Sequence, residues 1–146
     1  MKDSGKRVSA FALVAVIAIG MFVPGLRAKS VAGGKFTLPF NAQWEAMALQ
    51  TGDYTYSIDQ TSLGGTIFVY KGNQAVGLVR PQSFDDYKGQ GKNPVLICIR
   101  HNGNVTVRAL QLRGGTFYFS LPKELKGLMA QQPKLIETVS VEVTGQ

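Results

Sequence analysis

From Lys35 onward, apolar and polar residues alternate in short runs separated by Gly, Asn, Asp and Pro. Alternation with a period of two places successive side chains on opposite faces of a strand, and short runs of this kind are typical of antiparallel sheets. The pattern predicts an all-β fold, a single small antiparallel β-barrel or β-sandwich of about eight strands. The expected strands are 35–40, 54–59, 66–71, 74–80, 95–101, 105–112, 116–121 and 135–143.

Turn residues lie between several of these runs. Asn102-Gly103 separates two apolar runs, and this dipeptide readily takes the positive φ angles of a type I′ hairpin turn. Gly72-Asn73 lies in a similar position, and residues 113–115 are expected to turn the next strand pair.

One short helix near the C-terminus is expected over residues 122–132. Leu125, Leu128 and Met129 recur there with helical spacing, and Pro133 ends the segment. Such a helix could plug an open end of a barrel or lie across a sheet edge.

The first 28 residues read as a secretory signal peptide. A basic start, residues 1–7, precedes an apolar run of 16 residues that is shorter than the roughly 20 residues of a spanning helix. Cleavage is expected after Ala28 or, alternatively, after Ala32, which leaves one β domain over residues 33–146. The predicted location is secreted or periplasmic, with retention of the run as an amino-terminal anchor as the alternative.

Charge and cysteine content narrow the function classes. The full chain carries a net charge of +7, but residues 33–146 hold 11 basic and 8 acidic side chains, a net charge of +3. These cations are scattered, so nucleic acid is not an expected partner. Cys98 is the only cysteine, which excludes an intrachain disulfide.

The sequence offers no recognisable catalytic or metal-binding set. His101 is the only histidine, and Cys98 lies three residues before it on the same expected strand, where regular geometry points the two side chains to opposite faces. We therefore expect a buried, inert thiol, an ordinary surface histidine, and neither a metal nor a cofactor.

The longest expected loop spans residues 81–93 and is the candidate recognition surface, because binding residues often lie on long loops of a rigid scaffold. Its partner would be a protein or a carbohydrate. Tyr54 and Tyr56 share a strand face and are either an exposed aromatic row or core packing. The candidate binding residues in the loop are Phe84, Asp85, Asp86, Tyr87, Lys88 and Lys92.

Two segments carry a resemblance to a known group. Residues 36–40 read Phe-Thr-Leu-Pro-Phe, and residues 49–56 read Leu-Gln-Thr-Gly-Asp-Tyr-Thr-Tyr. This order resembles small, uncharacterised exported β proteins common in Acidobacteria, which have a Phe-x-x-Pro-Phe strand and then a Leu-Pro-Ala-Gly-x-Tyr turn. Gln50-Thr51 replaces Pro-Ala here. The resemblance covers residues 36–121 and implies a bacterial, exported β domain, with no catalytic residues to carry over.

These observations predict an exported non-enzymatic protein, a binding or structural module of the bacterial envelope or extracellular space. One alternative is a hydrolase that uses Asp85, Asp86 or another carboxylate on an envelope or extracellular polymer. Another is a fibre-forming subunit that associates through unpaired edge strands.

Overall fold

The computed structural model describes residues 32–59, 64–87 and 91–145. Within these ranges the chain is mostly β-structure, as the sequence predicts, with one α-helix and one short 3-10 helix. The elements in chain order are β1 (Ala32–Leu38), β2 (Ala42–Trp44), β3 (Met47–Leu49), β4 (Gly52–Asp59), β5 (Thr66–Lys71), β6 (Gln74–Val79), β7 (Ser83–Asp86), β8 (Val95–His101), β9 (Asn104–Gln111), β10 (Gly115–Tyr118), α1 (Lys123–Gln131), η1 (Pro133–Leu135) and β11 (Glu137–Thr144).

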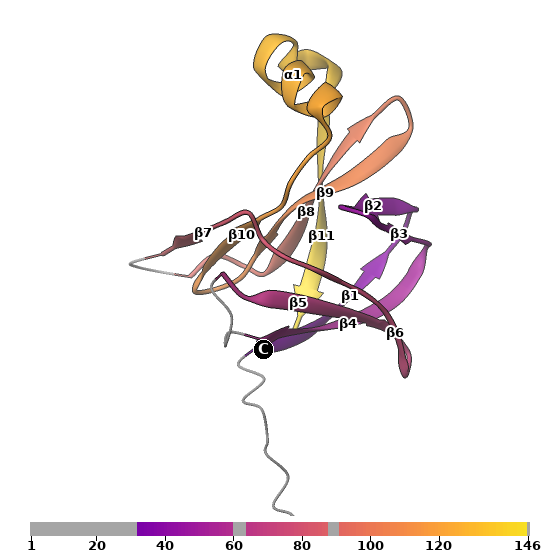
Figure 1. Ribbon diagram of the computed structural model, residues 1–146, viewed down its shortest axis with the longest axis vertical. Helices are drawn as coiled ribbons and strands as arrows, with labels where there is room; N and C mark the ends of the chain where they lie inside the picture. Colours follow the sequence, from indigo (N-terminus) through magenta and orange to yellow (C-terminus); the bar gives the residue numbers. More distant parts are fainter. Residues whose placement is uncertain (1–31, 60–63, 88–90, 146) are drawn as a thin grey trace, which may run out of the picture.

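The strands form one sheet that curls into a nearly closed barrel (Figure 1). Its main path runs β3-β2-β9-β8-β11-β1-β4-β5-β6, and every neighbouring pair on it is antiparallel except β2 with β9. The two end strands approach each other where Met47 lies against Gly77, so close that a Cβ on the glycine would lie 2.9 Å from the methionine sulfur. The sequence left barrel and sandwich open, and the structure is barrel-like.

Two strands branch off the main path. These are β10 and β7. One edge of β9 pairs with two strands, with β2 at Thr106 and with β10 from Ala109 to Gln111. β7 then pairs with β10 on its free side. Among the described strands β7 has no second partner, so it is an edge strand of the sheet.

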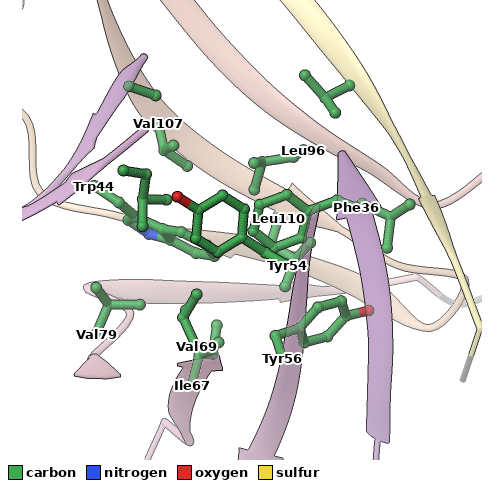
Figure 2. Packing of buried hydrophobic residues seen from close by; sticks show 14 of the residues in the cluster. Phe36, Trp44, Tyr54, Tyr56, Ile67, Val69, Val79, Leu96, Val107 and Leu110 are labelled. Atoms are coloured by element: carbon green, nitrogen blue, oxygen red, sulfur yellow. The ribbon is translucent and has the colours of Figure 1, made fainter. Parts of the chain in front are cut away.

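Inward-facing rings and aliphatic side chains fill the barrel. In Figure 2 the rings of Phe36, Trp44 and Tyr54 lie together, with Phe36 stacked on Tyr54 at 5.5 Å between centroids. Tyr54 and Tyr56 are each only 3% exposed, so they pack in the core and do not form an exposed row. Full burial of each large apolar side chain stabilises a fold by about 1.5–3 kcal/mol, so a core built from many of them can hold the domain together without a disulfide.

The hairpin turn between β8 and β9 confirms the sequence prediction. Asn102 and Gly103 have φ angles of 49° and 77°, the two positive values that a type I′ turn requires. The β5–β6 hairpin likewise turns at Gly72, whose φ is 60°.

Three short strands are absent from the sequence prediction. β2 and β3 form a small hairpin whose turn has Glu45 at a φ of 51°, in place of the glycine or asparagine that would mark it. β7 lies inside the segment 81–93 that was expected to be a loop, so that expectation is wrong for Ser83–Asp86. These additions raise the strand number above the expected eight.

The segment that follows β10 also departs from expectation in one place. Helix α1 forms where it was expected, and Figure 1 shows it standing beyond one end of the strands. Pro133 starts the helical turn η1, which leaves Leu135 at 54% exposure, and β11 begins only at Glu137. Val141 and Val143 are buried, as the alternation of the strand predicts.

The expected leader, residues 1–28, lies outside the described residues. Neither helix within the described ranges is long and apolar enough to cross a membrane.

Candidate functional site

Four of the six residues expected to form a binding surface lie on the edge strand β7 or directly after it. Phe84, Asp85 and Asp86 belong to the strand itself, and Tyr87 follows it directly. Lys88 lies outside the described residues, as do its two successors. Lys92 lies beside Tyr87, so the structure brings these two candidate residues together.

Phe84 is the exposed apolar side chain of this surface. Its ring is 45% exposed, although it lies 4.6 Å from the ring of Phe117 between centroids. The ring covers Gly115, where an added Cβ would lie 2.6 Å from Cε2 of Phe84. Glycine on β10 thus makes room for the ring, which is held at one face while the other faces solvent.

Tyr87 and Lys92 form a second, more polar part of the surface. The hydroxyl groups of Tyr87 and Thr116 are hydrogen-bonded, which ties the tyrosine to β10. Nζ of Lys92 lies 4.9 Å from the centroid of the Tyr87 ring, a cation–π geometry that contributes about 0.5–1 kcal/mol at exposed sites. The tyrosine is therefore held between a strand and a cation.

The two adjacent carboxylates do not converge on a common point. Asp85 and Asp86 are consecutive residues of a strand, so their side chains point to opposite faces, and both are exposed. A glycosidase needs two carboxyl groups facing each other across a cleft at about 5–10 Å. This pair lacks that arrangement, and the described residues include no cluster of three or more His, Cys, Asp or Glu side chains that could hold a metal ion.

Cys98 is a buried free cysteine, in agreement with the sequence prediction. Burial raises the pKa of its thiol from 9.0 to about 12, so the thiolate that would act as a nucleophile is scarce at neutral pH. His101 is half-buried at the end of β8, where its Nδ1 lies 3.1 Å from the carbonyl oxygen of Leu135. That contact ties the end of β8 to η1 and gives no catalytic partner to the imidazole.

The sequence reasoning missed a second exposed surface, on β6, one of the two end strands of the main path. β6 contains no charged residue, and its Val76 and Leu78 are 37% and 51% exposed. They alternate along the strand and so share a face. The lack of any charge between Lys71 and Arg80 was the signal in the sequence, because edge strands usually carry charges that oppose association.

Comparison of the chain with protein-family models, with curated proteins and with solved structures found no match. The resemblance to exported proteins of Acidobacteria therefore stays a prediction.

Proposed function

We propose that this chain is the precursor of an exported, non-enzymatic binding module of the bacterial envelope or extracellular space. Its recognition surface is the edge strand β7 with Phe84 and the Tyr87–Lys92 pair. One observation carries the proposal: a large ring, 45% exposed yet fixed by Phe117 and Gly115, lies on a strand whose outer edge has no described partner.

The favoured partner is an extended polypeptide segment. An unpaired strand edge offers backbone N–H and C=O groups in a row, and a peptide can add to it as a further strand. Phe84 would supply the apolar anchor, and hot spots of binding are often aromatic. The charges of Asp85, Asp86 and Lys92 around it would select the peptide sequence.

The test uses a library of displayed linear peptides and an array of bacterial polysaccharides, both probed with the domain from Gly33 onward. We expect selected peptides to lose about tenfold or more in affinity with Phe84→Ser, a loss typical of a hot-spot residue. The matched control is Leu135→Ser, since Leu135 is similarly exposed at 54% but belongs to η1. Equal affinity of both variants would contradict the proposed surface, and binding only on the polysaccharide array would replace the peptide by a sugar.

Export has a separate test. Cells that produce the full chain are fractionated, and the mature protein is expected in the periplasm or medium without residues 1–28. Full-length protein in the membrane fraction would indicate the anchored alternative.

Self-association through β6 is a second candidate function. The exposed Val76 and Leu78 on an uncharged edge strand favour it, and it corresponds to the fibre-forming alternative. Light scattering of the purified domain over a range of concentrations is the test. A mass that grows with concentration, and that Leu78→Lys returns to one chain, would support it, whereas a constant single-chain mass would exclude it.

A hydrolase would need a carboxylate pair other than Asp85 with Asp86, because those two side chains diverge.

A further inference from the structure

A hollow of about 380 Å³ lies where the end of β10 meets helix α1, and Phe84 does not line it. It is a shallow depression and not an enclosed cavity. The hollow opens to solvent. The residues that matter most in its lining are Arg108, Tyr118, Phe119, Leu121, Lys126 and Met129.

The floor of the hollow is apolar. Phe119 is 3% exposed and lies against the core, while Leu121 and Met129 are half-buried. Helix α1 has no fully buried residue, so its apolar side is only partly covered by the rest of the described chain. In Figure 1 the helix stands off the strands accordingly. A hydrocarbon chain placed here would cover surfaces that the fold leaves incompletely packed.

Arg108 reaches the hollow because of an irregularity in β9. Ile97 pairs with Ala109 but the next residue, Cys98, pairs with Val107, so Arg108 is an extra residue that no residue of β8 opposes. Such a β-bulge changes the direction of a side chain, and bulges are frequent next to functional sites. The backbone N–H of Phe119 donates to the carbonyl oxygen of Arg108, which fixes the bulge against the segment that forms the floor.

The charges around the hollow are all of one sign. Arg108 and Lys126 line it and no carboxylate does. Neither cation has an ion pair or a side-chain hydrogen bond with another described residue. Glu45 accepts a hydrogen bond from the backbone N–H of Ser120 and does not line the hollow. A half-buried guanidinium on an apolar floor favours an anionic partner.

We propose that this hollow binds a single-chain fatty acid. The two carboxylate oxygens match the planar fork of the Arg108 guanidinium, which can donate two parallel hydrogen bonds to them. Lys126 lies beside the same carboxylate as a second cation. The alkyl chain lies along Phe119, Leu121 and Met129. The lining includes Gln82, just before β7, but none of the candidate residues of the β7 surface, so variants can test the two assignments separately.

The chain contains its own reporter for this site. Trp44 is the only tryptophan, and its ring meets Phe119 edge to face at 5.0 Å between centroids. Because Phe119 is part of the floor, a bound alkyl chain changes the surroundings of the indole through one intervening ring. Fluorescence of Trp44 and isothermal titration calorimetry therefore measure binding independently.

The experiment titrates the domain with decanoate, decanol, decyltrimethylammonium and acetate, all below micelle-forming concentrations. Decanoate is expected to bind saturably at one site and to change the Trp44 signal. Decanol and the cationic amphiphile share its tail, acetate shares its head group, and each is expected to bind weaker by about tenfold or more, since a charge-assisted head contact and apolar burial both contribute. Equal binding of decanol and decanoate would overturn the assignment of a carboxylate site.

Variants then locate the head group. Arg108→Gln should weaken decanoate by about tenfold or more, and Lys126→Gln by a few-fold, because the first removes a bidentate contact and the second a single charge. Lys123→Gln is the control, since Lys123 is an exposed cation of the same helix that does not line the hollow. Lys126 is exposed on α1, so Lys126→Gln should fold even if Arg108→Gln, at the β-bulge, does not. Unchanged affinity in both lining variants, or an equal loss in the control, would refute the proposal.

Discussion

Replacing Gly115 by alanine tests whether β7 is packed against β10 as the structure describes. An alanine Cβ there would lie 2.6 Å from Cε2 of Phe84, and closer still to Cζ of the same ring and to the carbonyl oxygen of Asp85. Ordinary contacts begin at 3.4 Å, so the strands must separate by roughly 1 Å. The Phe84 ring could rotate away, but the backbone oxygen of β7 could move only by loosening its pairing with β10.

The loss of stability follows from the interactions that break when β7 and β10 separate. Backbone hydrogen bonds contribute about 0.5–1.5 kcal/mol each, and the Phe84–Phe117 ring pair about 0.5–1.5 kcal/mol beyond its buried area. One of each, lost or weakened, gives about 2 kcal/mol, within the roughly 1–3 kcal/mol typical of overpacking. Gly114→Ala is the matched control, because a Cβ there meets nothing within 4 Å and should stabilise by about 0.4–1 kcal/mol through the unfolded state.

Urea unfolding, monitored by Trp44 fluorescence, measures the difference in stability between each variant and the wild type. With an m value of about 2 kcal/mol/M, a loss of 2 kcal/mol lowers the midpoint by about 1 M, whereas the control should leave it equal or slightly higher. The same midpoint for Gly115→Ala and Gly114→Ala would refute the packing of Phe84 over Gly115. The proposed recognition surface would then lose the support that fixes its ring.

Three further predictions concern the core and the amino terminus. Burial raises the pKa of Cys98 from 9.0 and that of Tyr56 from 10.0, each to about 12, so the folded state keeps these protons to a higher pH than the unfolded state does. The free energy of unfolding, measured by denaturant titration, should therefore be constant below pH 9 and fall between pH 9 and 12. The fall should be less steep in Cys98→Ala, which lacks one of the two groups. Cys98→Ser should lower the free energy of unfolding by about 1–3 kcal/mol, because the serine hydroxyl would be buried in an apolar core. Thiol labelling of the wild type should be slow until denaturant is added, and fast labelling of the native protein would contradict the burial. Mass spectrometry of the exported protein should find a first residue near Lys29 or Gly33, and an intact chain would contradict a cleaved leader.

The sequence predicted the regular strands well, since one face of each meets the core. β5 and β8 have the expected bounds, because alternating or continuous apolar residues there lie between clear turn residues. β2 and β7 were missed for physical reasons. β2 alternates between buried and exposed residues, but its three residues beside a turn without glycine are too few to stand out, whereas all four residues of β7 are exposed and show no alternation.

The candidate site was predicted in part. Phe84, Asp85 and Asp86 lie on a strand edge and not on a free loop, and Tyr87, which follows them, contacts Lys92. The hollow at Arg108 was not predicted, although a signal for it exists. The core residues of β9 and its end are Val105, Val107, Leu110 and Leu112, so the inward spacing changes from two to three at the bulge. Regular alternation had been assumed across that change.

The place of β11 in the barrel affects the order in which the domain can fold. β11 lies between β8 and β1, and it meets β1 only through Lys35 with Thr144 and Phe36 with Val143, pairs about 110 positions apart. Such contacts close a long loop of chain before they contribute any stability, which makes folding slow. The sheet between β8 and β1 is therefore completed only after the last described strand has been synthesised, although β2 can pair with β9 before that.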